Sequence, residues 1–458
     1  MPILPSDLLQ AAAERGGRIA LVIGAGCSLE APTSLSLASA YSLEAHRKLV
    51  ADGILDSADC ATPGDLSALA SCVHAKTGGQ TALVTRLPLA AFRHALPNSG
   101  YLTAVALLRE GAIDSVLTLN FDLALSKGVA DLSGHEISTI TGPGVTGQVS
   151  AGSVIYLHRS VEENDFEQWI LTSEALNAGW QDSWQEVVAA RSLSCPVVVF
   201  AGLGSKAAVL TATVSKIKAS LSNGQHHEFV VDPGQDSEFK AELALPPSAH
   251  IQLGWGEFMN QLGDRVVEEL VHLLDGAARA VCDANQWDDP GESLEVVLAA
   301  IGNFDVVRFG RNRARWLLAD EMYSPDDHYR RAHVADLLLG LSEILRDANN
   351  SLSFDRDGLA VIDANDGGSQ IRVKLASGNG VLRWSALEAK LIATSSADEA
   401  APDVVLVAGV EGTRPANGPP LDLIGGLEEG DLVAGPIRAH FVHVDEVRAD
   451  PSIIRELV

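Results

Sequence analysis

The sequence predicts an α/β protein: a first domain built on a mostly parallel sheet with helices on both faces, followed by a smaller α+β domain. Three observations lead to this prediction. Five short apolar runs lie between Ile19 and Val231, helical patterns separate most of them, and closely spaced short strands follow from Ser351 onward. Strands that alternate with helices are typical of a parallel sheet wound on both sides.

The first domain begins with a helix and a buried strand. Ser6 or Asp7 can cap a helix over Leu8–Gly16, which ends at a glycine pair. The next run, Ile19–Ile23, is apolar throughout, as expected for a strand buried on both faces. The remaining predicted strands are Ser115–Leu119, Val154–Leu157, Val197–Ala201 and Glu228–Val231, and the predicted helices are Ser173–Ala190, Ala207–Leu221 and Trp255–Leu274.

The second domain is predicted from a boundary segment and from a change to short predicted strands after it. The segment Cys282–Gly291 carries a run of Asp, Pro and Gly, so the domains are predicted to span 1–278 and 279–458. In the helix predicted over His333–Arg346, apolar residues recur on one face. The other predicted elements are the helix Ser293–Ala300, the strands Leu359–Ile362, Ile371–Leu375, Val404–Val407 and Ala439–Val444, and a loop over Gly409–Pro420.

Composition limits the function classes. The 458 residues carry a formal net charge of −27, so the surface repels phosphate backbones and bulk nucleic-acid binding is not expected. The five cysteines are odd in number and irregularly spaced, which argues for a reducing compartment and against a cysteine zinc site. No apolar run approaches the roughly 20 residues needed to span a bilayer, and the N-terminus does not resemble a signal peptide. A cytoplasmic protein without a membrane segment is therefore expected.

Two glycine turns follow predicted strands. The first is Gly24-Ala25-Gly26-Cys27-Ser28, and the second is Gly202-Leu203-Gly204-Ser205. Glycines at such a point let the main chain approach a diphosphate, and the following N–H groups can donate to it. The first turn lacks the third glycine of the G-x-G-x-x-G pattern, so a tight connection without a ligand stays an alternative.

Polar residues end three of the other predicted strands. Asn120 and Asp122 follow one strand, His158 follows the next, and Asp232 follows the last. Ligands bind at this edge of open parallel sheets. Asn offers a donor and an acceptor, a neutral His is the usual general base, and an acid can hold a ribose hydroxyl. The alternatives are that Asn120 or Asp122 caps the next helix and that His158 is structural.

In their order, these five features resemble the sirtuin-like family, and in particular its bacterial anti-phage NAD hydrolases. The similar motifs are GAGCS (24–28), TLNFD (118–122), LHR (157–159) and GLGS (202–205), with Ala31-Pro32-Thr33 and Ile170-Leu171-Thr172 beside them. The resemblance covers residues 10–275 and implies a Rossmann-like sheet. Arg159 stands where the family pattern has glycine, and the four-cysteine zinc module of deacylating members is absent.

The resemblance implies that the protein binds NAD and splits its nicotinamide–ribose bond without zinc. Asn120 would hold a water or a ribose hydroxyl, His158 would accept a proton, and Asp122 would contact the carboxamide or fix the loop. The resemblance implies that Gly24, Ala25, Gly26 and Ser28 hold the diphosphate and that Gly204, Ser205 and Asp232 surround the adenosine. Cys27, Thr33 and Gly202 complete the implied NAD-binding residues.

The sequence is compatible with three alternative activities. The resemblance implies NAD hydrolysis or cyclisation by an effector that depletes NAD during phage attack. Arg159 favours a non-catalytic NAD or ADP-ribose sensor, and the missing zinc cysteines disfavour a protein deacylase. Because an NAD-depleting enzyme must stay silent until it is triggered, residues 279–458 are expected to regulate or assemble the protein. The expected partners are further copies of the chain or a defence protein such as an ATPase or a short Argonaute.

Overall fold

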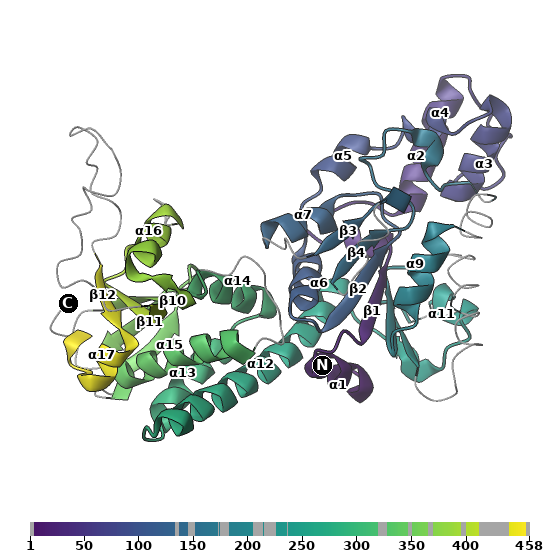
Figure 1. The fold of residues 1–458 in the computed structure, drawn as a ribbon. Helices are drawn as coiled ribbons and strands as arrows, with labels where there is room; N and C mark the ends of the chain where they lie inside the picture. The colour runs from purple at the N-terminus through teal and green to yellow at the C-terminus, as the bar shows by residue number, and fades with distance from the viewer. Residues whose placement is uncertain are drawn as a thin grey trace, which may run out of the picture. The chain divides into compact units, whose positions relative to one another are not determined.

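The structure is a computed structural model that describes residues 4–132, 137–144, 152–172, 174, 183–204, 214, 226–235, 237–318, 328–346, 350–364, 370–394, 400–411 and 439–454. The chain divides into two compact units, Met1–Val266 and Val267–Val458. The division falls inside one helix, α12 (Trp255–Asn285) (Figure 1). This helix continues past Leu274, where the sequence pattern placed its end.

Unit 1 contains a seven-stranded sheet in the order β3-β4-β2-β1-β5-β6-β7, and each pairing described within it is parallel. The prediction of a mostly parallel sheet is therefore confirmed. The edge strands β3 and β7 were not predicted, because runs of three and two residues show no periodicity. The strands are β1 (Ile19–Ile23), β2 (Ile113–Thr118), β3 (Ser138–Ile140), β4 (Ser153–Tyr156), β5 (Val197–Ala201), β6 (His227–Val231) and β7 (His250–Ile251).

The strand order locates the place where a ligand is expected. Apart from the edge strand β3, the order β4-β2-β1-β5-β6-β7 corresponds to the order 3-2-1-4-5-6 of Rossmann-like sheets. The order reverses between β1 and β5, and ligands of such sheets bind in the crevice outside the carboxyl ends of the strands at this point. The two glycine turns follow β1 and β5 and therefore lie at this switch point.

Helices cover both faces of the sheet (Figure 1), and all five residues of β1 are buried, as predicted. The first helix begins at Ser6 rather than Leu8. Pro5 takes the N-cap position without a side-chain hydrogen bond, so the predicted caps Ser6 and Asp7 lie inside the helix. The helices of this unit are α1 (Ser6–Glu14), α2 (Ala38–Ala51), α3 (Leu66–Thr77), α4 (Thr81–Val84), α5 (Leu89–His94), α6 (Ser99–Arg109), α7 (Ala124–Asp131), α9 (Trp184–Leu193) and α11 (Glu238–Glu242), with 3-10 helices η1 (Ala25–Ser28), η3 (Phe166–Gln168) and η4 (Pro247–Ala249).

Two predicted helices are described only in part. Helix α9 matches the second half of the predicted Ser173–Ala190 and ends three residues later, at Leu193. Residues 173 and 175–182 lie outside the described residues, as does the predicted helix Ala207–Leu221 except for Val214.

Unit 2 has a mixed five-stranded sheet in the order β12-β11-β10-β9-β8, in agreement with the predicted α+β class. β8, β9 and β10 pair antiparallel, whereas β10, β11 and β12 pair parallel. β11 includes Gly409–Glu411, so the predicted loop begins later, and 412–420 lie outside the described residues. The elements are α13 (Glu292–Gly302), α14 (Val306–Trp316), α15 (His328–Arg346), β8 (Asn350–Phe354), β9 (Ala360–Ala364), β10 (Ile371–Arg383), α16 (Trp384–Thr394), β11 (Val404–Glu411), β12 (His440–His443) and α17 (Val444–Ala449).

The apolar stripe of α15 lies in the core of its own unit. Val334, Leu337, Leu338, Leu341 and Leu345 are each at most 5% exposed. Their burial follows from their spacing on one face of the helix. The stripe is therefore packed within unit 2 and is not exposed. Among the helices that the structure describes, none has the length and apolar character needed to cross a membrane.

Candidate active site

The glycine turns that follow β1 and β5 pack directly against each other. Gly24 donates its N–H to Ala201 O (2.9 Å), and Gly26 donates to Gly202 O (3.0 Å). A Cβ atom on Gly202 would lie 2.5 Å from Cys27 N, and one on Gly26 would lie 2.7 Å from Gly202 Cα. Gly202 also has a φ of 64°, which L side chains adopt only at a cost. This contact requires glycine at both positions whether or not a ligand is bound.

A buried hydrogen-bond network joins the β1 turn to the end of β2. Ser28 Oγ lies 2.9 Å from Asp122 Oδ2 and 2.7 Å from Tyr101 OH. Asn120 Nδ2 lies 3.1 Å from Gly24 O, 3.2 Å from Ser28 Oγ and 3.1 Å from Tyr101 OH. The four side chains are buried, and the most exposed of them, Asn120, is 8% exposed. The structure thus brings Ser28, Asn120 and Asp122 together and adds Tyr101.

The donor of each hydrogen bond in this network can be assigned from the groups that can only accept. Gly24 O can only accept, so the amide nitrogen of Asn120 faces it. Ser28 donates to Asp122, and its oxygen then accepts from Tyr101. The second N–H of Asn120 is shared between the oxygens of Tyr101 and Ser28. Within the described part of the chain, no donor reaches Asn120 Oδ1, which leaves this oxygen to accept from a ligand hydroxyl or a water.

Tyr101 was missed by the sequence reasoning because it lies inside an apolar helix. It begins the buried face of α6, and its position is fixed by Asn98, which caps that helix. Asn98 Oδ1 accepts from Tyr101 N (3.1 Å), and Asn98 Nδ2 donates to Cys27 O (2.8 Å). The sequence signal that could have pointed to Tyr101 is Asn98, an asparagine at a helix N-cap three residues before the tyrosine. Asn98 therefore ties α6 to the first glycine turn.

The carboxyl group of Asp122 has two roles. Its Oδ2 accepts from Ser28, while Oδ1 accepts from Ala124 N (3.0 Å) at the start of α7. Asp122 thus also supports the next helix, as the alternative interpretation held. Burial raises the pKa of Asp122, and the bonds from Ala124 and Ser28 oppose this rise. Burial also raises the pKa of Tyr101, as does the nearby Asp122 charge, so the phenol keeps its proton as a donor.

His158 lies in the turn that follows β4. Thr118 of β2 pairs with Tyr156 of β4, so Asn120 and His158 each lie two residues beyond a paired position. The His158 ring is 6.5 Å, centroid to centroid, from the ring of Phe121, the neighbour of Asn120. Burial lowers the pKa of His158 to about 4. The imidazole is therefore neutral near pH 7 and can accept a proton.

Arg159 occupies the left-handed region, with a φ of 75°. Its guanidinium joins three other segments. Nη1 donates to Thr141 O (2.8 Å) after β3, Nη2 donates to Gln168 Oε1 (3.1 Å) in η3, and the group lies 5.7 Å from the ring centroid of Trp184 in α9. The backbone conformation is the one glycine adopts readily, so the chain keeps the geometry of a glycine here with an arginine in its place. The side-chain contacts offset the backbone strain.

We expect Arg159→Gly to unfold at a higher urea concentration than Arg159→Ala. Both variants lose the same guanidinium contacts, but only glycine relieves the left-handed strain, which amounts to about 1 kcal/mol. Urea unfolding of the two variants measures this difference directly. Ala244→Gly, at another left-handed position with a φ of 52°, measures the same strain at a second site and should raise the urea midpoint relative to the unsubstituted chain. An alanine variant as stable as the glycine variant would contradict the strained backbone.

The other residues of the predicted site are more scattered. Thr33 is buried and donates to Leu96 O (2.7 Å), Ala25 is half-buried, and Gly204 is exposed. Asp232 follows β6, and its Oδ1 accepts from Gly234 N (2.8 Å). Ser205 lies outside the described residues. Cys27 is fully buried, and burial raises the pKa of its thiol, so its role in the turn is packing.

The described residues show no metal centre. No group of three or more His, Cys, Asp or Glu side chains within them is arranged to hold a metal ion. All five cysteines, Cys27, Cys60, Cys72, Cys195 and Cys282, are free thiols.

Comparisons with known proteins give similarity at the level of solved structures. No protein-family model matches the chain, and no curated protein matches it. A mutant Sir2 homologue in complex with ADP-ribose is 16% identical, and the alignment covers 58% of this chain and 98% of the other, with a TM-score of 0.33. A Sir2 homologue in complex with NAD is also 16% identical, with coverages of 58% and 95% and a TM-score of 0.33. The fold class assigned above rests on the strand order of this chain.

Proposed function

We propose that this protein cleaves the nicotinamide–ribose bond of NAD at the carboxyl ends of β1, β2 and β4. The observation that carries the proposal is the buried network of Ser28, Tyr101, Asn120 and Asp122, which leaves one amide oxygen open at the switch point. The order of the sequence motifs, with its resemblance to NAD hydrolases, supports NAD as the substrate.

The reaction requires few functional groups from the protein. Nicotinamide leaves as a neutral group from a cationic ribosyl pyridinium, and positive charge develops at the sugar. Asn120 Oδ1 accepts from a ribose hydroxyl or from the attacking water, and the network fixes its direction. Neutral His158 accepts the proton that this water loses. The Asp122 carboxylate, whose two oxygens accept hydrogen bonds, would stabilise the positive charge that develops at the sugar.

Product analysis separates the candidate activities. The purified chain is incubated with NAD, and the products are resolved by chromatography. Nicotinamide with ADP-ribose indicates hydrolysis, whereas nicotinamide with cyclic ADP-ribose indicates cyclisation. Saturable NAD binding without nicotinamide release would support the sensor, for which Arg159 beside His158 is the specific observation. Nicotinamide release that depends on an acylated peptide would support the deacylase.

The low pKa of His158 predicts an unusual pH profile. A base with a pKa of about 4 is neutral at all higher pH values, so kcat/KM for nicotinamide release should stay flat down to about pH 5. Activity should fall as the pH approaches 4 and the ring gains a proton, and protonation of Asp122, whose pKa burial raises, adds to the same acid limb. An acid limb near the ordinary histidine value of about 6.5 would contradict the burial of His158.

The stability of the fold must be followed in the same pH window. The unfolded chain protonates His158 near pH 6.5 and the folded chain only near 4, so the unfolded state binds more protons between these values. The contribution of His158 to the free energy of unfolding therefore falls as the pH is lowered from 6.5 to 4. Circular dichroism at each pH separates loss of activity from loss of fold.

We further propose that the enzyme depletes NAD in the cytoplasm during phage attack and is switched on through residues 279–458. Self-assembly or a defence partner, such as an ATPase or a short Argonaute, would supply the switch. The support is a second unit with its own sheet and core but no catalytic motif. Raising the active fraction from 1% to 99% needs a preference of about 5.5 kcal/mol for the active state.

The proposed regulation through residues 279–458 predicts how the rate of nicotinamide release depends on assembly. The full chain alone should release nicotinamide slowly, and the rate should rise by an order of magnitude or more with concentration or with an added partner. Rates measured across protein concentrations and with co-expressed neighbouring proteins test this. High, constant activity of the isolated chain would contradict the proposed switch while leaving the proposed reaction intact.

A further inference from the structure

A cavity of about 420 Å³ opens beside the edge strand β7. It lies one strand beyond β6, on the opposite side of that strand from the switch point. Its size falls within the range of about 300–1,000 Å³ that is typical of small-molecule sites. None of the residues proposed to hold NAD lines it.

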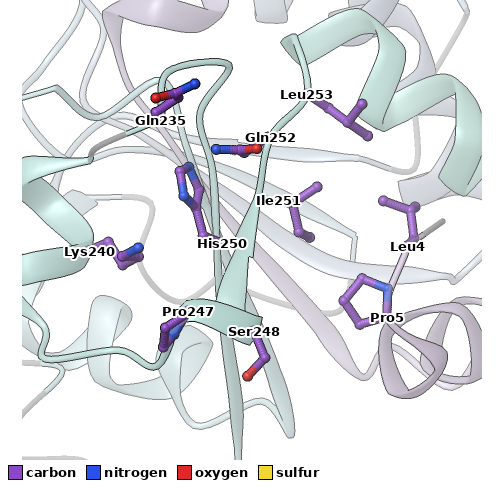
Figure 2. Close-up of a pocket in the computed structure, with 10 residues that line it drawn as sticks. All are labelled: Leu4, Pro5, Gln235, Lys240, Pro247, Ser248, His250, Ile251, Gln252 and Leu253. Atoms are coloured by element: carbon purple, nitrogen blue, oxygen red, sulfur yellow. The ribbon is translucent and has the colours of Figure 1, made fainter. Parts of the chain in front are cut away.

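The walls of the cavity are of two kinds. Leu4, Ile251 and Leu253 form an apolar wall and are each less than 10% exposed. Lys240 and His250 belong to the polar part. Figure 2 shows Lys240, Gln235 and His250 on one side of the β7 segment, and Leu4, Pro5 and Ile251 on the other. Because both sets line one cavity at this edge of the sheet, a ligand that contacts both lies across β7, with a charged end on one side and an apolar body on the other.

The charge of the lining is opposite to that of the chain. The chain carries 60 acidic and 33 basic residues, yet none of the described residues that line the cavity is acidic. Lys240 is half-buried, and among the described residues no carboxylate forms an ion pair with its ammonium group. A half-buried ammonium group is stabilised by an anion within hydrogen-bond reach.

His250 has a fixed orientation in this cavity. Its Nε2 lies 3.2 Å from Asp232 O, and because a carbonyl only accepts, Nε2 carries the proton. This hydrogen bond fixes the imidazole in the cavity wall. Lys240 is therefore the lining residue that can pair with a negatively charged ligand.

We propose that this cavity binds a small organic carboxylate, whose apolar body lies against Leu4, Ile251 and Leu253 and whose carboxylate meets Lys240. A single ammonium group matches a monoanion. A phosphate dianion is usually held by several cationic side chains or by a row of backbone N–H groups, which this lining does not supply. The cavity adjoins the proposed NAD site at Asp232, whose carbonyl bonds to His250, but none of its described lining residues belongs to that site, so ligand binding in the cavity can be measured without NAD.

The test compares hexanoate with hexan-1-ol, which has the same carbon chain without the charge. Calorimetry or ligand-observed NMR on the full chain should show saturable hexanoate binding. Hexanol should bind about 10-fold more weakly or less, because it lacks the charge-assisted contact with Lys240. Lys240→Met should weaken hexanoate binding by a similar factor.

Two further variants locate the binding. Lys48→Met removes a lysine that pairs with Glu44 on the surface of α2 and should leave hexanoate binding unchanged. Asn120→Asp, which alters the proposed NAD site, should also leave it unchanged. Equal binding of hexanol, unchanged binding in Lys240→Met, loss of binding in Asn120→Asp or no saturable binding at all would overturn the proposal. None of these results bears on NAD cleavage.

Discussion

Gly202→Ala should destabilise the protein by about 2–5 kcal/mol, a large part of the stability of an ordinary domain. The added Cβ would lie 2.5 Å from Cys27 N and 2.9 Å from Cys27 Sγ. One of the two main-chain turns must then move, and the φ of 64° adds backbone strain. Because the clash is with backbone, no side-chain rotation relieves it. Urea or thermal unfolding measures the loss.

Gly204→Ala is the matched control for this prediction. Gly204 lies two residues further along the same turn, and a Cβ there would meet no atom of the described residues within 4 Å. Its effect on stability should stay within about 0.5 kcal/mol, as for ordinary exposed substitutions. If the two alanine variants were equally stable, the close packing of the β1 and β5 turns would be wrong.

Asn120→Asp should lower nicotinamide release by about 10²–10³-fold, the usual cost of removing a preorganised polar contact from an active site. The new carboxylate would face Gly24 O, which only accepts, and would share Ser28 with Asp122. His158→Ala should lower the rate by about 10²–10⁴-fold through loss of the base. Initial rates of nicotinamide release measure both effects.

The two substitutions differ in their effect on stability. Asn120 is buried with three acceptors around its amide nitrogen, so Asn120→Asp should also cost about 1–3 kcal/mol of stability. Asn303→Asp, at the exposed end of α13, and His272→Ala, on an exposed position of α12, repeat the chemical changes away from the site and should keep full activity. Folded Asn120 and His158 variants with normal rates would remove both residues from the mechanism.

The sequence predicted the sheet of unit 1 well because its strands are buried on both faces. A run such as Ile19–Ile23 has no polar residue, and such a run between helical patterns has few other interpretations. The same strands carry Asn120, Asp122 and His158 at their carboxyl ends, so their place in the fold could be predicted from the sequence, whereas their roles remain a proposal. The packing of Gly26 on Gly202 could not, since it joins residues 176 positions apart through the strand order.

What the sequence did not predict depends on tertiary contacts. Tyr101 looked like one more apolar position of α6, and only the fold places its hydroxyl beside Ser28. The left-handed conformation of Arg159 is set by partners in three other segments. In unit 2, β8 and α17 were not predicted because elements of five and six residues show little periodicity of their own. α14 and α16 were also not predicted, although each is as long as the predicted helix α13.

The most direct test of the account is a crystal structure of the His158→Ala chain with NAD. Removal of the base should leave uncleaved NAD bound. The account predicts the nicotinamide ribose beside Asn120 Oδ1, with the carboxamide near Asp122. The diphosphate should lie over the turn at 24–28, and the adenosine between the ends of β5 and β6. A nicotinamide ribose away from Asn120, or NAD bound only in the cavity beside β7, would contradict it.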